Sequence, residues 1–205
     1  MKVKICGLRR FEDIDYVNEF LPDYAGFIFA PQSKRYITSD FALKLKNKLN
    51  KKIKSVGVFV NENLENIRKI ADLHIIDLIQ LHGDENNAFI EQVKTSTNLP
   101  VIKAFRANGQ LKAKLTCSNA DFVLIDSCQG NKFGGTGTIF DWSVIPESIK
   151  GRLFLAGGIN SSNIREAMKI NPYCLDINSG VETDGFKDKI KMKEVFEIIK
   201  ETEYE

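Results

Sequence analysis

Reactive side chains occur at the ends of short apolar segments in this chain. Cys6 ends the segment Val3–Cys6, and Asp126 ends the segment Phe122–Asp126. A thiol and a carboxyl group can take and give protons when burial or nearby charge tunes their pKa values. Each residue alone also fits a structural role, Cys6 as a buried thiol and Asp126 as a helix cap or a solvated strand end.

Other polar residues occupy corresponding places along the chain. Arg35 follows the second apolar segment, while Gln80 and His82 close the fourth. Arginine can hold a carboxylate with two parallel hydrogen bonds, a geometry that the neighbouring Lys34 does not offer. Gln80 and His82 are candidates for polar contact with a ligand, although a histidine at a strand end also fits a structural role.

Glycine-rich segments follow the last three predicted strands. They are Gly134–Gly137, Gly157–Gly158 and the Ser179–Gly180 pair. Glycine lets backbone amides approach an anion closely, and a helix N-terminus adds a favourable dipole. One such segment need only make a tight turn, but three on adjacent strands predict a site for a phosphorylated ligand. The expected contacts are Gly135, Gly137, Gly157, Gly158, Ser179 and Gly180, and Asp176 and Asn178 are candidates for supporting the last loop.

Elements that position these residues alternate regularly along the chain. Eight short apolar segments rich in β-branched residues are the predicted strands: Val3–Cys6, Ala25–Ala30, Ser55–Val60, Leu78–His82, Val101–Phe105, Phe122–Asp126, Leu153–Ala156 and Leu175–Asn178. Each is followed by a segment whose apolar residues recur every three or four positions, as on one helix face. The fifth and sixth of these helices are expected near Gln110–Thr116 and Phe140–Ile149, and the last carries Met192, Val195, Phe196 and Ile199.

This alternation predicts an α/β protein with a parallel sheet covered by helices. Eight strand–helix units in 205 residues fit a single (β/α)8 TIM barrel domain over residues 1–205. An open doubly wound sheet is the competing architecture, but its Gly-x-Gly-x-x-Gly turn is missing after the first strand. In a barrel the strand C-termini build the active site, and loops after strands seven and eight often bind phosphate.

Composition and charge exclude several classes of partner. Hydrophobic residues make up 43% of the chain and charged residues 27%, and the formal net charge is +2. The densest basic run, Lys44–Lys54, alternates with leucines like the solvated face of a helix, so no nucleic-acid partner is expected. No apolar segment reaches the length of about 20 residues that spans a bilayer, so no membrane partner is expected. The N-terminus lacks the features of a signal peptide, which favours a cytoplasmic location.

No metal is expected either. The four cysteines show no Cys-x-x-Cys spacing, and His74 and His82 are the chain's two histidines. Cys117 and Cys174 are expected to be small, inert and partly buried side chains.

The ordered set of motifs resembles one enzyme family. The segments similar to phosphoribosylanthranilate isomerase are Lys4-Ile5-Cys6-Gly7-Leu8, Gly26–Tyr36, Val56–Asn61, Ile79-Gln80-Leu81-His82-Gly83, Val101–Phe105 and Leu124-Ile125-Asp126-Ser127. So are Gly134–Gly137, Phe140-Asp141-Trp142, Leu155–Ile159 and Ser179-Gly180-Val181-Glu182. Each motif alone is weakly specific, but together they come from every strand in the same order and cover nearly the whole chain.

The resemblance implies a reaction and the residues that carry it. Members of the family catalyse the Amadori rearrangement of N-(5'-phosphoribosyl)anthranilate to 1-(2-carboxyphenylamino)-1-deoxyribulose 5-phosphate in tryptophan biosynthesis. The resemblance implies that Cys6 is the general base, Asp126 the general acid and Arg35 the contact for the anthranilate carboxylate. It also implies an enzyme without a cofactor, acting as a monomer or homodimer on a small phosphorylated substrate.

Two alternatives remain open from the sequence. Another phosphate-binding barrel enzyme, such as indole-glycerol-phosphate synthase or a pentose-phosphate epimerase, would need a lysine and glutamate set or metal-binding residues that the sequence does not place. A noncatalytic barrel that binds a sugar phosphate is the second alternative, because a fold does not determine a function. It would bind the ligand without turning it over.

Overall fold

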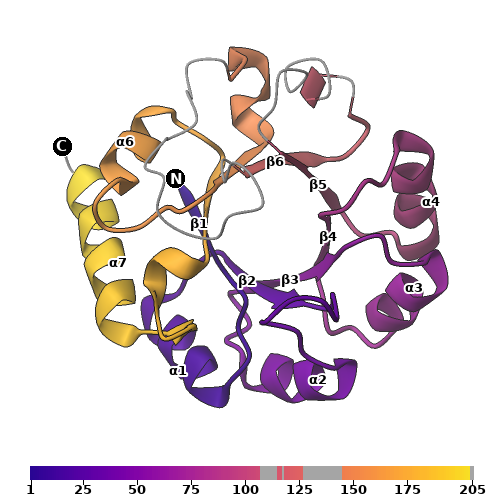
Figure 1. The fold of residues 1–205 in the computed structure, drawn as a ribbon, viewed down its shortest axis with the longest axis horizontal. Coiled ribbons are helices and arrows are strands. Elements are labelled where there is room, and N and C mark those ends of the chain that lie inside the picture. Colours follow the sequence, from indigo (N-terminus) through magenta and orange to yellow (C-terminus); the bar gives the residue numbers. More distant parts are fainter. Residues whose placement is uncertain (107–114, 117, 127–144, 204–205) are drawn as a thin grey trace.

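A closed barrel of eight parallel strands forms the centre of the molecule (Figure 1). The computed structural model describes residues 1–106, 115–116, 118–126 and 145–203. The barrel strands are β1 (Lys2–Cys6), β2 (Tyr24–Ile28), β3 (Lys54–Phe59), β4 (Leu78–Leu81), β5 (Val101–Arg106), β6 (Phe122–Asp126), β7 (Leu153–Ala156) and β8 (Cys174–Ile177). Pairing of β1 with β8 closes the sheet, with Val3 opposite Leu175. The predicted (β/α)8 barrel is therefore confirmed.

Helices surround the barrel on its outer side (Figure 1). They are α1 (Phe11–Phe20), α2 (Ser39–Lys48), α3 (Leu64–Asp72), α4 (Asn87–Thr97), α6 (Ile164–Lys169) and α7 (Lys189–Glu203), with short 3₁₀ helices η2 (Glu147–Arg152) and η3 (Ser179–Val181). The side chains of Thr38, Asn63 and Asn86 accept hydrogen bonds from backbone N–H groups in the first turns of α2, α3 and α4, which starts these helices at defined residues.

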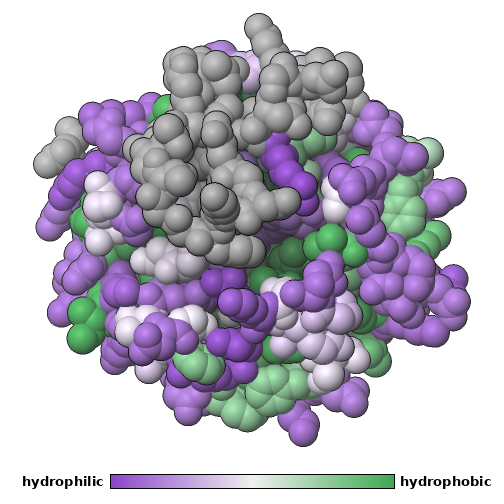
Figure 2. Space-filling view, viewed as in Figure 1, coloured by the Kyte–Doolittle hydropathy of each residue, from purple (hydrophilic) through white to green (hydrophobic). Residues whose placement is uncertain are grey.

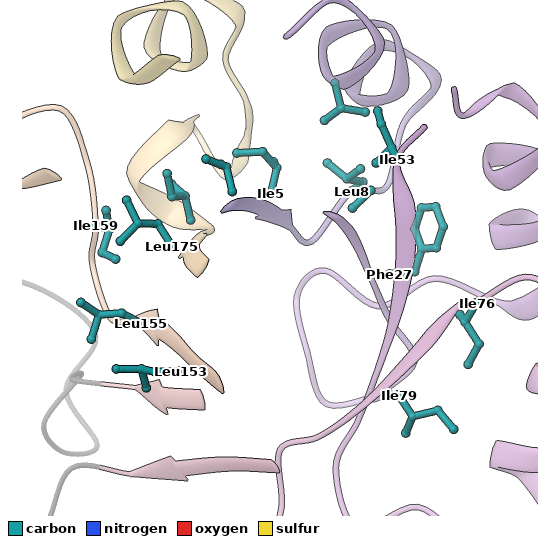
Figure 3. Close-up of a cluster of buried hydrophobic side chains, with 14 of the residues drawn as sticks. Ile5, Leu8, Phe27, Ile53, Ile76, Ile79, Leu153, Leu155, Ile159 and Leu175 are labelled. Atoms are coloured by element: carbon teal, nitrogen blue, oxygen red, sulfur yellow. The ribbon is translucent and has the colours of Figure 1, made fainter. Parts of the chain in front are cut away.

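Alternation along each strand sorts side chains between two cores. In β4, Leu78 packs inside the barrel, whereas Ile79 packs outward against the helices. Figure 3 shows the outward layer, in which Ile5, Phe27 and Leu155 project from different strands toward the helix ring. Because both faces of the sheet are covered, the strands read as continuous apolar segments in the sequence.

The predicted sixth and seventh strands match the observed bounds, and the bounds of the other six differ by one or two residues. The second strand was expected at Ala25–Ala30 and runs from Tyr24 to Ile28, and the eighth ends at Ile177 instead of Asn178. Strand ends are set by the last hydrogen-bonded pair in the ladder, which apolar patterning does not specify. The polar residues that were expected at strand ends therefore lie one residue beyond them in β4 and β8.

Three expectations about helices need correction or fall outside the description. The basic run was expected to lie on one helix, but α2 ends at Lys48 and the later lysines lie in a turn and at the start of β3. Leu49 adopts an extended backbone there, and the N–H of Asn50 donates to the side chain of Asn18. After β6 the first described helix is the 3₁₀ helix η2; most of the helices expected at 110–116 and 140–149 lies outside the described residues.

A small antiparallel hairpin between β8 and α7 is a feature that periodicity did not indicate. Its strands are β9 (Glu182–Thr183) and β10 (Phe186–Lys187), with Lys187 opposite Glu182. In Figure 1 this orange-yellow pair lies beside α1 and the start of α7. Two-residue strands are too short for an alternation pattern to show in the sequence.

The described helices include none that is long and apolar enough to cross a bilayer. On the face shown in Figure 2, hydrophilic side chains cover most of the described surface and hydrophobic areas are small and separate.

Candidate active site

Because side chains alternate between the two faces of a strand, the candidate residues point into the barrel. Cys6, Gln80 and Asp126 each stand an even number of residues from an inward-facing side chain of the same strand: Lys4, Leu78 and Leu124. All of the barrel strands are parallel, so their C-terminal ends meet at one mouth. The thiol predicted from the first strand and the carboxyl group predicted from the sixth therefore lie at the same end of the barrel.

The Cys6 thiol is closely enclosed. Only 4% of the residue is exposed, and it packs against Ile28 and Val58 from the next two strands. Gly26 faces it, and a Cβ at that position would lie 2.7 Å from the sulfur, so glycine makes room for the thiol.

Burial raises the pKa of the Cys6 thiol, although the ammonium groups of Lys4 and Lys187 oppose that rise. The sequence suggested that nearby positive charge would favour a thiolate. The charges are present, but desolvation outweighs them, because a low-dielectric environment disfavours the charged form of the thiol.

A row of polar side chains crosses the barrel interior and is hydrogen-bonded from Asp176 as far as His82. The fully buried Lys4 ammonium donates to Asp176 Oδ2 at 2.7 Å and to Gln80 Oε1 at 2.8 Å. Gln80 Nε2 lies 2.9 Å from His82 Nδ1, and His82 Nε2 lies 3.7 Å from Asp126 Oδ2. These five residues connect strands β8, β1, β4 and β6. The row thus runs from beside Cys6 to Asp126.

The direction of hydrogen bonding in this row fixes the His82 tautomer. Gln80 Oε1 accepts from Lys4, so its amide nitrogen must donate to Nδ1 of His82. A neutral imidazole that accepts at Nδ1 carries its proton on Nε2. His82 therefore presents an N–H group toward the carboxyl group of Asp126, whose side chain is 30% exposed.

Arg35 reaches this end of the barrel from the loop after β2. Its Cδ lies 2.6 Å from where a Gly7 Cβ would stand, so the arginine passes over the backbone next to Cys6. Gly7 has φ +79°, a left-handed conformation that glycine adopts without strain. The guanidinium makes two hydrogen bonds to Glu182, from Nε at 2.8 Å and from Nη2 at 2.5 Å.

Backbone conformation or close packing requires glycine at several positions after β7 and β8. Gly157 and Gly158 have φ values of 103° and 68°. At Gly180 an added Cβ would overlap the carbonyl oxygen of Ile159, so the two loops are in direct contact. The structure therefore brings the predicted Gly157, Gly158, Ser179 and Gly180 together. The predicted Gly135 and Gly137 lie outside the described residues.

Sequence reasoning missed several members of the site. Lys4 and Lys187 were assigned no role, although both are buried ammonium groups. A lysine inside an apolar strand such as Val3–Cys6 was the available signal for Lys4. Asp176 was expected to support the phosphate loop; its carboxylate instead pairs with Lys4, and its Oδ1 has no hydrogen-bond partner in the described part of the chain.

Two cavities mark opposite ends of the barrel. A cavity of about 390 Å³ at the C-terminal mouth is lined by His82, Lys103 and Arg106 among others. A cavity of about 770 Å³ at the N-terminal end is lined by Tyr24, Tyr173 and their neighbours. The titratable residues predicted to act in catalysis lie at the C-terminal mouth, as in barrel enzymes generally.

Comparison with known proteins agrees with this arrangement over nearly the full chain. A family model described as N-(5'phosphoribosyl)anthranilate (PRA) isomerase matches residues 3–198. The N-(5'-phosphoribosyl)anthranilate isomerase of Endomicrobium trichonymphae is 45% identical over 200 residues, covering 97% of this chain and 98% of the relative. The protein of the same name from Thermoanaerobacter sp. (strain X514) is 46% identical over 203 residues, covering 98% of each chain.

Solved structures of the same enzyme family are also similar to this chain. The phosphoribosyl anthranilate isomerase of Thermotoga maritima aligns with a TM-score of 0.87 at 34% identity, covering 98% of this chain and 99% of that one. A phosphoribosyl anthranilate isomerase in complex with reduced 1-(o-carboxyphenylamino)-1-deoxyribulose 5-phosphate aligns with a TM-score of 0.84 at 32% identity, with coverage of 98% and 99%. The chain belongs to the N-(5'-phosphoribosyl)anthranilate isomerase family and is an enzyme.

Proposed function

We propose that this chain converts N-(5'-phosphoribosyl)anthranilate into 1-(2-carboxyphenylamino)-1-deoxyribulose 5-phosphate, with Cys6 as general base and Asp126 as general acid. The observation that carries the assignment of roles is the placement of both groups inside the same barrel mouth, with the row of polar side chains between them. The relatives named for this reaction support the choice of substrate.

The first step opens the ribose ring. Asp126 gives its proton to the ring oxygen while the bond from that oxygen to C1' breaks. The nitrogen lone pair forms the C=N bond of a protonated Schiff base. Asp126 is suited to this step because it is partly exposed at the mouth, where a sugar can reach it. The Nε2–H of His82 faces the carboxyl group and favours one orientation of it.

The second step moves a proton away from C2'. The Cys6 thiolate removes it, and the electron pair of the C–H bond forms an enolamine as the iminium nitrogen regains its lone pair. The enolamine then tautomerises to the ketone, with one proton leaving the C2' hydroxyl and one added at C1'. Lys4 supports the thiolate by charge, since its ammonium lies beside Cys6 in the interior.

Two anchors at opposite ends of the substrate fix the reacting carbons between acid and base. The glycine loops after β7 and β8 take the phosphate, with Gly157, Gly158, Ser179 and Gly180 as contacts, together with Gly135 and Gly137. Arg35 takes the anthranilate carboxylate, and Gln80 and His82 contact the sugar. Within this proposal the chain is one domain over residues 1–205 and acts in the cytoplasm as a monomer or homodimer without a cofactor.

A fluorescence assay tests the proposal directly. Phosphoribosylanthranilate is made in situ from anthranilate and a phosphoribosyl donor, and its loss is followed after the purified chain is added. We expect first-order loss whose rate is proportional to enzyme concentration. Tight binding of the substrate without any loss of it would favour the noncatalytic sugar-phosphate barrel instead.

A further inference from the structure

The hairpin β9–β10 carries the carboxylate that holds Arg35. Glu182 is 9% exposed, and it accepts from Arg35 Nε and Nη2 along one side of the guanidinium. The two residues are 147 positions apart in the chain, so tertiary folding alone brings them together. This side-on pairing uses two of the five N–H groups of the guanidinium and fixes its plane.

Among the described residues, none forms a hydrogen bond with the opposite edge of the same guanidinium. In the part of the chain that the structure describes, Glu182 is the one hydrogen-bond partner of the Arg35 side chain. The remaining N–H groups, two on Nη1 and one on Nη2, form an end-on fork that can bind a second carboxylate with two parallel bonds. Arg35 passes over Gly7, the residue that follows Cys6, with its Cδ and Nε atoms nearest to that glycine.

Lys187 holds Glu182 in turn. Its buried ammonium donates to Glu182 Oε1 at 2.7 Å and to the backbone oxygen and Oδ1 of Asn178 at 2.9 and 3.0 Å. Lys191 adds a bond from its ammonium to the backbone oxygen of Glu182 at 2.6 Å. Arg35 and Lys187 together carry two positive charges against the single negative charge of Glu182. Arg35, Lys187 and Glu182 together therefore keep one positive charge that attracts an anion.

We propose that Glu182 is a positioning residue that orients Arg35 so that its end-on fork faces the aryl carboxylate of the substrate. This inference deepens the proposed function and rests on the role given there to Arg35. Glu182 does not touch the reacting atoms. It limits the rotamers of a long side chain before the substrate arrives, and pre-organisation of this kind increases affinity without any new contact to the ligand.

The test compares two stable ligands that differ by one group. The probes are reduced 1-(o-carboxyphenylamino)-1-deoxyribulose 5-phosphate and the same compound with an unsubstituted phenyl ring. We expect Glu182→Gln to weaken binding of the carboxylated probe by about tenfold and to leave the phenyl probe within about twofold. The glutamine amide can accept from only one of the two Arg35 N–H groups, because its nitrogen is a donor. In turnover, KM should rise more than kcat falls.

A matched control and a second variant separate the outcomes. Glu201→Gln makes the same chemical change in a surface pair, where Glu201 binds Arg165 at 2.7 Å, and should change neither affinity. Arg35→Lys should weaken the carboxylated probe selectively; if it does not, the role of Arg35 in the proposed function fails. If Arg35→Lys behaves as expected while Glu182→Gln has no effect, weakens both probes equally or tightens the carboxylated one, the positioning role of Glu182 is wrong.

Discussion

At the scale of single residues, the site separates a buried base from a partly exposed acid. Cys6 is enclosed by apolar side chains and lies near the ammonium groups of Lys4 and Lys187, whereas Asp126 stands at the mouth. Such a division suits two proton transfers of different kinds, since removal of a carbon-bound proton benefits from a dry base. Delivery of a proton to a ring oxygen needs only an accessible carboxyl group.

Removal of either group should abolish most of the turnover. We expect Cys6→Ser and Asp126→Asn each to lower kcat by about 100- to 10,000-fold, the contribution of a positioned acid or base. Both changes nearly preserve side-chain volume, so circular dichroism and the melting temperature should stay close to those of the unchanged chain. Near-normal turnover by either variant would remove that residue from the mechanism.

In the free enzyme most of the Cys6 thiol should be protonated at neutral pH, so the thiolate that acts as the base is a minor form and kcat/KM should rise with pH. Burial raises the pKa of this thiol, and Lys4 and Lys187 only partly offset that effect. Thiolate ultraviolet absorbance, taken as the difference between the unchanged chain and Cys6→Ser, should therefore appear only above the ordinary thiol pKa of about 8.5. The difference cancels the signal of Cys174, which is also buried with a raised pKa. A thiolate signal already complete at neutral pH would contradict this expectation.

At the scale of elements, the ends of β7 and β8 work as one unit. The backbone of η3 lies against the carbonyl of Ile159, and Asn160 and Asn163 fold the loop after β7 back onto the oxygen of Gly158. The hairpin after η3 then returns toward Arg35. One stretch of chain thus carries both the candidate phosphate loop and the carboxylate that orients Arg35.

A methyl group added at Gly180, where the loops after β7 and β8 meet, should weaken ligand binding. Gly180→Ala places a Cβ on the Ile159 oxygen, so the two loops must separate, and we expect KM for the substrate to rise about tenfold or more. Gly151→Ala is the matched control, because a Cβ there meets no atom within 4 Å. Titration with inorganic phosphate and steady-state kinetics measure the effect. Equal behaviour of the two variants would separate the junction from phosphate binding.

At the scale of the whole molecule, a packed aromatic cluster and the proposed catalytic residues lie at opposite ends of the barrel. Phe154 fills the N-terminal end, where its ring lies 5.4 Å from Tyr24 and 5.5 Å from Phe122. The hydroxyl groups of Tyr24 and Tyr173 are 2.9 Å apart there. The titratable side chains proposed for catalysis stand at the other end, a division that barrel enzymes share.

Replacement of Phe154 by alanine should therefore lower the stability of the fold and leave catalysis nearly unchanged. Phe154→Ala removes a fully buried ring, and we expect the free energy of unfolding to fall by about 3–5 kcal/mol. At a temperature where the variant is still folded, kcat/KM should stay within about threefold of the unchanged chain. Urea denaturation and steady-state kinetics on the same preparation measure both quantities. A large loss of kcat/KM with full folding would show that the two ends are coupled.

Local patterning in the sequence determined the eight barrel strands and most of the described helices. Apolar segments of four to six residues, such as Phe122–Asp126, are typical of strands buried on both faces, and three-to-four spacing in the last helix correctly marked Met192 and Val195 as buried. Position at a strand end was enough to nominate Cys6 and Asp126, because parallel strands bring their C-termini to one mouth. The family motifs then supplied a reaction.

Only the tertiary structure decided which charges meet. Lys4 pairs with Asp176 across 172 positions and with Gln80 across 76, and Arg35 pairs with Glu182 across 147. Each of these contacts depends on barrel closure and strand register, which no local pattern encodes, since a shift of one residue would turn each side chain to the other face. The pKa of Cys6 likewise depends on how completely distant strands exclude water, and in this chain that exclusion outweighs the nearby positive charge.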